Sequence, residues 1–156
     1  IPSGQTLDAS GATLVPSAGQ VVQCVQFYDA NTAKEESTSQ VFVGSNIRKT
    51  ITPTYSNSLI ITQLTISMAD SVSDRIKAKL RVNGVDMPGT DQYHAGYQAA
   101  MDGYGRYTPL VNQSQYTCTS TTPLEFRVYY RSSTGGAVRI THTDTSSGLT
   151  LWEIAQ

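Results

Sequence analysis

The stretch RIKAKLRVNG, residues 75–84, decides the fold class of this chain. Cations alternate along it with apolar residues, which are Ile76, Ala78, Leu80 and Val82. Successive side chains of a β-strand point to opposite faces, so this spacing predicts a strand with one buried and one solvated face. We therefore expect Leu80 to be buried and Lys79 to be exposed. Asn83-Gly84 follows directly, and this dipeptide is a strong signal for a hairpin turn.

The same alternation recurs along most of the chain beyond residue 20, and no segment shows an apolar stripe of helical spacing. Further strands are predicted at 21–28, 40–43, 47–51, 59–68, 124–130, 137–142 and 149–155. Short strands separated by Gly, Asn and Ser turns are typical of two-layer β folds. The sequence therefore predicts an all-β fold, an antiparallel β-sandwich of jelly-roll type, whose last three strands form a meander.

Length and composition fit one folded domain and argue against nucleic-acid binding and membrane insertion. The 156 residues carry a net charge of −1, whereas a nucleic-acid-binding domain is expected to be basic. Only 15% of the residues are charged, and 17 Ser and 20 Thr supply polarity instead. The longest apolar stretches are too short to span a bilayer. Cys24 and Cys118 are expected to be buried thiols, with one disulfide between them as the alternative.

Residues 1–19, IPSGQTLDASGATLVPSAG, contain a short repeat with few apolar side chains. Gly4-Gln5-Thr6-Leu7 returns as Gly11-Ala12-Thr13-Leu14. Such a repeat cannot offset its ordering entropy alone, so it is stable only when it stacks on neighbours. We predict that residues 1–20 end a β-shaft formed by three copies of the chain, and that residues 21–156 form a head domain. A Ser/Gly-rich linker is the alternative for the first segment.

Three sets of motifs resemble virion fibre proteins of marine and cyanobacterial phages. Residues 1–19 are similar to a shaft-to-head junction of the pattern I-P-x-G-x-T-L-x-x-S-G-A-T-L-x-x-P-A-G. Ile51-Thr52-Pro53 with Ser58-Leu59-Ile60-Ile61 is similar to the family's I-T-P…S-S-K-I-L-V segment, and Thr150–Ala155 to its closing T-L-x-E-I-A. The resemblance implies a homotrimeric, jelly-roll-like knob of a tail or head fibre, exposed on the virion and joined to other virion proteins through its shaft.

The segment Asp86–Gln115 departs from that pattern and lacks clean alternation. A loop of this length in a compact domain usually carries a function or a partner contact. It is rich in Tyr and Gly, a composition that binding loops and subunit interfaces share. We predict a site for host surface glycan or an envelope protein, with packing between subunits as the alternative. The candidate ligand-binding residues are Tyr93, His94, Tyr97, Asp102, Tyr104, Arg106 and Tyr107.

The cation row Arg75, Lys77, Lys79 and Arg81 has two interpretations. It is either the solvated face of a half-buried strand, paired with Glu125 or with Asp residues of a neighbour, or a patch for acidic polysaccharide or the host envelope. We favour the first interpretation, because alternation alone explains the spacing.

The sequence contains no motif with a catalytic mechanism. Its two histidines, His94 and His142, belong to no zinc-ligand spacing, and no G-x-S-x-G elbow occurs. We therefore predict no enzyme activity, no cofactor and no metal. The predicted function is host-surface attachment by a virion fibre knob. The alternatives are a structural head-fibre or capsid-decoration protein and, third, a glycan depolymerase that uses paired carboxylates.

Overall fold

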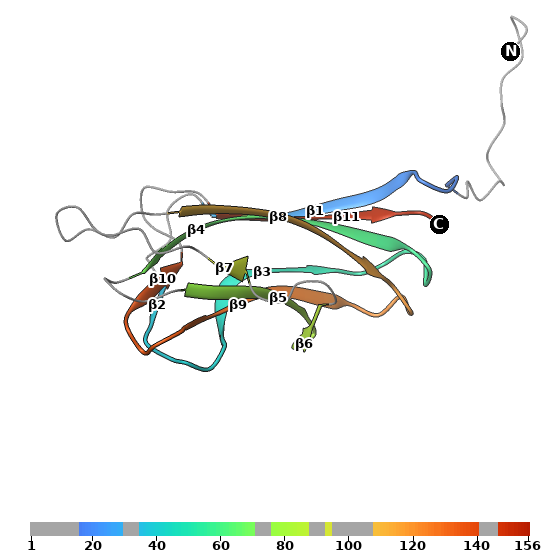
Figure 1. The fold of residues 1–156 in the computed structure, drawn as a ribbon. Coiled ribbons are helices and arrows are strands. Elements are labelled where there is room, and N and C mark those ends of the chain that lie inside the picture. The colour runs from blue at the N-terminus through green and yellow to red at the C-terminus, as the bar shows by residue number, and fades with distance from the viewer. Residues whose placement is uncertain (1–15, 30–34, 71–75, 88–92, 95–107, 141–146) are drawn as a thin grey trace, which may run out of the picture.

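The computed structural model describes residues 16–29, 35–70, 76–87, 93–94, 108–140 and 147–156, and these ranges contain strands and no helix. The strands form two antiparallel sheets that lie face to face (Figure 1). The predicted all-β sandwich is therefore confirmed. In the same ranges there is no helical segment that could cross a membrane.

Sheet A, whose long strands form the upper layer in Figure 1, has the order β1-β11-β4-β10-β2, and β8 pairs with the other edge of β4. β11 and β10 follow one another along a single edge of β4, because β11 pairs with Leu59–Thr65 and β10 with Met68–Asp70. The strands of sheet A are β1 (Val21–Asp29), β2 (Glu35–Ser37), β4 (Leu59–Asp70), β8 (Thr108–Thr117), β10 (Val138–Ile140) and β11 (Ser147–Ile154).

Sheet B has the order β3-β9-β5-β6, and β7 also pairs with β5. Its strands are β3 (Val43–Ile51), β5 (Ile76–Val82), β6 (Val85–Asp86), β7 (Tyr93–His94) and β9 (Leu124–Ser132). The chain runs from β1 in sheet A to β3 in sheet B, back to β4, across to β5 and β7, back to β8, across to β9 and back to β11. This interleaving of the two layers is that of a jelly roll.

The predicted meander of the last three strands is wrong. β9 lies in sheet B between β3 and β5, whereas β10 and β11 both pair with β4 in sheet A. A strand joins the sheet in which its apolar face is buried, and a short link to the next strand does not decide this. The link after β9 therefore crosses from one sheet to the other.

The hairpin predicted at Asn83-Gly84 is confirmed. Asn83 has a φ of 48° and Gly84 a φ of 81°, and two successive positive φ angles define the turn that such a dipeptide favours. Val82 consequently pairs with Val85. Leu80 is buried as expected, but Lys79 is only 9% exposed, so the prediction of a solvated Lys79 is wrong.

Part of the predicted loop Asp86–Gln115 is a strand. β8 pairs with β4 from Leu59 to Met68. Its inward-facing residues include Asn112 and Ser114, and these polar side chains hide the alternation on which the sequence prediction relied. The strand expected at 40–43 is likewise displaced, because residues 38–42 are not in a strand and β3 begins at Val43.

The core lies between the two sheets and draws on both, with Ile60, Leu64 and Leu149 from sheet A and Ile47, Leu80 and Phe126 from sheet B. Cys118 is buried against this core, but Cys24 is exposed, and neither forms a disulfide. The prediction of two buried thiols is therefore right for Cys118 and wrong for Cys24. The register explains the difference, because Cys24 lies opposite Trp152 on the outer side of sheet A.

The residues that precede β1 lie beside the C-terminal strand. The Gly19 amide donates to the Ala155 carbonyl at 2.8 Å, and the Ala155 amide donates to the Gln20 carbonyl at 2.9 Å. Most of the opening repeat, residues 1–15, lies outside the described residues. The shaft and the boundary at residue 20 therefore stay predictions.

Candidate functional site

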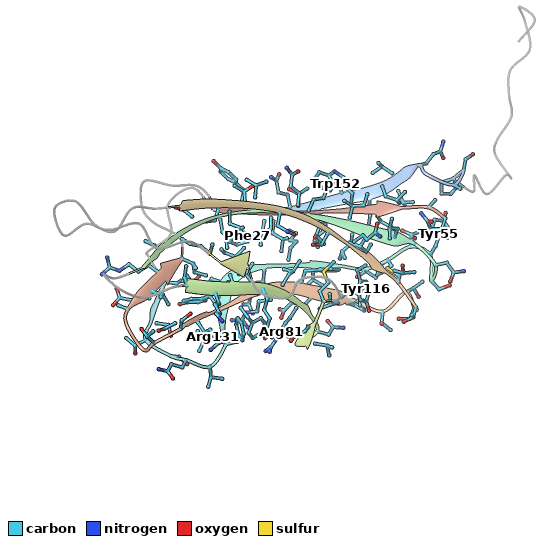
Figure 2. The ribbon with its side chains drawn as sticks, in the orientation of Figure 1. Phe27, Tyr55, Arg81, Tyr116, Arg131 and Trp152 are labelled. Carbon is cyan, nitrogen blue, oxygen red and sulfur yellow. The ribbon has the colours of Figure 1, made fainter. Side chains whose placement is uncertain are left out.

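The outer side of sheet B gathers cations and aromatic rings, and we call it the basic face. Strand alternation produces it, since the inward-facing residues of β5 and β9 are apolar or small and the residues between them point outward. Figure 2 shows Arg81 and Arg131 on this outer side. The basic face comprises Phe42, Arg48, Lys77, Lys79, Arg81, Asp86, Glu125, Arg127, Tyr129 and Arg131.

Strand register places like charges of the basic face directly opposite one another. Arg127 of β9 lies between Arg48 of β3 and Arg81 of β5. Lys77 lies opposite Arg131. Cross-strand pairs of like charge are destabilising, so this arrangement costs the sheet stability.

Two aromatic rings hold these cations. The Lys79 Nζ atom lies 4.2 Å from the centre of the Phe42 ring, and the Arg131 guanidinium carbon lies 5.2 Å from it. The Arg81 guanidinium carbon lies 4.5 Å from the centre of the Tyr129 ring, and that of Arg127 lies 5.7 Å from it. All four distances lie within the range of cation–π attraction. The rings therefore fix the cations in a layer over the sheet.

Asp86 and Glu125 neutralise part of this charge. Asp86 accepts hydrogen bonds from Lys79 Nζ at 2.5 Å and from Arg81 Nε at 2.6 Å. These two bonds, from Lys79 first and then Arg81, hold the pKa of the Asp86 carboxyl below its usual value. Glu125 lies 3.7 Å from Arg48 in an exposed ion pair. The predicted pairing of the cation row with Glu125 or a neighbouring Asp is thus found, with Asp86 as the partner of Lys79 and Arg81.

Arg127 and Arg131 are held by uncharged acceptors instead. Arg127 Nε donates to the Ser45 carbonyl at 2.7 Å, and Arg131 Nη1 donates to the Gln40 carbonyl at 3.0 Å. Arg131 Nε is buried without a hydrogen-bond partner among the described residues. The charges of Arg127 and Arg131 are therefore oriented, and no carboxylate of the described residues pairs with them.

The predicted ligand-binding residues are only partly placed by the structure. Tyr93 and His94 form β7, in which Tyr93 pairs with Ala78 and His94 with Lys77. The tyrosine-rich segment thus begins at the edge of sheet B, beside the basic face. The other predicted ligand residues, Tyr97, Asp102, Tyr104, Arg106 and Tyr107, lie outside the described residues.

Sequence reasoning missed several members of the basic face. The alternation of β9 was sufficient to place Arg127, Tyr129 and Arg131 on one side together. The sequence does not show which residues of β9 lie opposite which residues of β5. Without this register, Arg127, Tyr129 and Arg131 could not be assigned to the same face as the cation row. Phe42 was expected within a strand at 40–43 but precedes β3, and nothing in the sequence linked it to β5 or β9.

A second polar centre lies at one end of the sandwich, around the buried Glu153. Its carboxylate accepts hydrogen bonds from the Thr54 and Tyr55 amides at 2.7 and 3.1 Å, from Ser58 Oγ at 2.6 Å and from Gln23 Nε2 at 2.6 Å. Burial opposes ionisation of Glu153, but these bonds outweigh it and hold the pKa below its usual value. Two of the motifs quoted above, residues 51–61 and 150–155, therefore meet here in a structural contact.

The neighbouring Cys118 is not poised for chemistry. Burial, and secondly the charge of Glu153, raises the pKa of its thiol to about 11, so that it is protonated at neutral pH. Beside this end lies a cavity of about 450 Å³, lined by Pro16, Tyr55, Asn57 and Gln156 among others. Within the described part of the chain, no three His, Cys, Asp or Glu side chains are close enough to hold a metal ion.

The outer side of the strands β1, β11, β4 and β8 of sheet A contrasts with the basic face, and we call this part of the sheet the uncharged face. Trp152 lies on this side in Figure 2, flanked by Cys24 and Ile61 through strand pairing. Among the described outward side chains of β1, β11, β4 and β8 none is charged. The remainder of the face is formed chiefly by Gln26, Gln63, Thr65, Gln113, Gln115, Thr150 and Ile154.

No known family model matches this sequence, and no curated protein matches it either. Similar solved structures include the sugar-binding EclA C-terminal domain, with 17% identity, a TM-score of 0.41, and coverage of 92% of this chain and 86% of that domain. Dimeric latent PorU of Porphyromonas gingivalis is 13% identical with a TM-score of 0.45, and the match covers 92% of this chain. The VP2 subviral particle of infectious bursal disease virus is 15% identical with a TM-score of 0.43, and the match covers the whole of this chain.

These neighbours thus include a sugar-binding domain and a viral capsid protein. The chain spans only 14% of PorU and 42% of VP2. At these identities and TM-scores, the likenesses carry no argument about the function of this chain.

Proposed function

We propose that this chain is the non-catalytic head of a phage virion fibre, displayed on the virion, and that it attaches to the host surface through the basic face and the segment that begins at β7. The observation that carries the proposal is the gathering of six cations and two carboxylates on one side of a chain whose net charge is −1. A face with a net positive charge steers a negatively charged surface toward it. The resemblance of residues 1–19, 51–61 and 150–155 to phage fibre proteins supports the virion context.

Neither Asp86 nor Glu153 suits the acid role that glycoside hydrolysis requires. Such hydrolysis needs one carboxyl group to donate a proton and another to act beside it. Asp86 is occupied by Lys79 and Arg81, and Glu153 is buried under four donors. A lowered pKa suits neither of them to the role of a general acid.

The proposal includes a homotrimer assembled through the uncharged face. Residues close to a threefold axis lie near their own copies, so a face without charge placed around the axis avoids like-charge repulsion. The basic face could not be used in this way. Three copies would also multiply weak attachment through effective concentration.

Binding of the fluorescently labelled chain to a panel of marine bacterial and cyanobacterial strains tests the attachment role. We expect saturable binding to at least one strain and competition with phage adsorption to that strain. Absence of binding across strains that the parent phage infects would overturn the attachment role. Release of reducing ends from host polysaccharide would instead establish a depolymerase.

A structural role in capsid decoration is the second candidate, and the uncharged face favours it, because that face could equally rest on another virion protein. Electron microscopy of virions labelled with an antibody against the chain separates the two roles. Label on the capsid, together with unchanged adsorption in the presence of the antibody, would favour decoration.

A further inference from the structure

Three cations of the basic face, Lys77, Arg127 and Arg131, make no ion pair with any residue that the structure describes. Lys77 lies directly opposite Arg131, and the two repel each other. An anion placed between two such cations gains attraction from both and removes their repulsion. An anion bound between Lys77 and Arg131 is therefore more favourable than water alone at that position.

The two arginines are also oriented before any ligand arrives. Each donates one N–H to a backbone carbonyl, Arg127 to Ser45 and Arg131 to Gln40. Arginine has five N–H donors in a planar fork, so further donors remain on the terminal nitrogens of both side chains. Such a fork binds carboxylates and other oxyanions through paired hydrogen bonds.

Gly44 makes room for the Arg127 guanidinium. A Cβ atom at position 44 would lie 2.7 Å from Arg127 Cζ and 2.8 Å from Arg127 Nε. Any side chain there would displace the end of Arg127 from the Ser45 carbonyl. Gly44 therefore acts as a positioning residue for this cation.

We infer that the basic face binds a linear acidic polysaccharide, carboxylated or sulfated, through Lys77, Arg127 and Arg131. The inference rests on the proposed attachment function and names its ligand. The cations are spread over the adjacent strands β5 and β9, whose spacing is about 4.8 Å. A polymer with repeated anionic groups can therefore engage several of them at once.

The charge distribution favours a polysaccharide over a nucleic acid. Six cations against two carboxylates give the face a charge of +4, so the rest of a chain with net charge −1 carries −5 and repels a long polyanion that wraps around it. Phe42 and Tyr129 lie beneath cations, so they present no open ring on which bases could stack. The polysaccharide is therefore bound by electrostatic attraction, and its contacts are confined to the basic face.

Binding of purified probes to the full chain tests the inference. The probes are heparin fragments as a sulfated chain, polygalacturonate as a carboxylated chain, neutral dextran, and single- and double-stranded DNA. We expect the chain to bind at least one acidic polysaccharide, to ignore dextran, and to lose binding near 1 M salt, where the screening length falls to about 3 Å. Isothermal titration calorimetry gives the affinities.

Substitutions locate the site. Arg127→Gln and Lys77→Gln should each weaken binding by about tenfold, because each removes a charge-assisted contact. Arg139→Gln is the matched control, since it removes the same charge from β10 of sheet A, and it should change the affinity less than twofold. Gly44→Ala keeps every charge but displaces Arg127, so it should weaken binding by a similar factor with an unchanged far-ultraviolet spectrum.

The outcomes separate this inference from the attachment function. Equal binding of dextran, equal losses in Arg127→Gln and Arg139→Gln, or tighter binding of DNA than of both polysaccharides would each overturn it. If the chain binds host cells and Arg127→Gln binds them equally well, attachment stands and the polysaccharide site does not. If the chain binds polygalacturonate through Arg127 but binds no host cell, the site stands and attachment fails.

Discussion

Glu153 shows how a single residue joins two distant motifs. Its carboxylate is buried, carries a charge, and has no cation among its hydrogen-bond partners. It is stabilised by donors from the loop before β4 and from β1, so it fixes that loop against the C-terminal strand. A buried charge of this kind is retained only where hydrogen bonds replace the lost hydration.

Glu153→Gln should lower the free energy of unfolding by about 2–3 kcal/mol. The neutral amide oxygen accepts weaker hydrogen bonds than the carboxylate, and the amide NH2 group faces the donors that bound the second carboxylate oxygen. Glu125→Gln makes the same chemical change at an exposed ion pair and should cost under about 0.5 kcal/mol. Urea unfolding of both variants checks the difference. Equal costs would mean that the carboxylate of Glu153 is not what holds the loop.

The lowered pKa of Glu153 also predicts acid sensitivity. In the unfolded chain this carboxyl titrates near its ordinary value of 4.5, and in the folded chain it titrates lower. Its stabilisation is therefore complete above about pH 4.5 and is lost as the pH falls through the folded value. Melting temperatures measured from neutral pH to pH 3 should fall more steeply for the parent chain than for Glu153→Gln. Parallel curves would contradict the assigned shift.

At the scale of one strand, β5 carries both the fold and the candidate site. Its inward residues fill the core, and its outward residues supply Lys77, Lys79 and Arg81 to the basic face. Lys79 differs from its neighbours because Phe42 and Asp86 cover it. The strand pattern alone could not show this, since Phe42 comes from a different part of the chain.

Substitutions along β5 should therefore give three grades of stability loss. Leu80→Ala should cost about 2–5 kcal/mol through a core cavity. Lys79→Ala should cost about 1 kcal/mol, because it removes the contact with Phe42 and the partner of Asp86. Lys77→Ala, without an ion pair among the described residues, should cost under about 0.5 kcal/mol. Equal losses for Lys77→Ala and Lys79→Ala in thermal melts would mean that Phe42 does not cover Lys79.

The sequence was sufficient to predict the strands whose two faces differ in polarity. β5, β9 and the Asn83-Gly84 hairpin follow from alternation and turn chemistry. β8 was missed because Asn112 and Ser114 face inward, and the meander was wrong because sheet membership depends on partners far away in the chain. The basic face needed the cross-strand register of β3, β9 and β5, which no local pattern contains.

At the scale of the whole molecule, the two sheets present opposite surfaces. The uncharged face and the basic face lie back to back across a core about 10 Å thick. An assembly formed through the uncharged face would turn every basic face outward. Assembly and attachment would then use different sheets and would not compete for the same residues.

Light scattering of the full chain tests this division of roles, and we expect the mass of a trimer. Gln63→Lys places one charge at the centre of the uncharged face, on β4 between Thr150 and Gln113. In a trimer whose threefold axis passes by this face, three such charges lie close together, so their repulsion should shift the mass toward that of a monomer. Thr50→Lys adds the same charge at an exposed position of sheet B and should leave the trimer intact. A trimer that survives Gln63→Lys but dissociates when residues 1–20 are deleted would move the assembly contact from the uncharged face to the shaft.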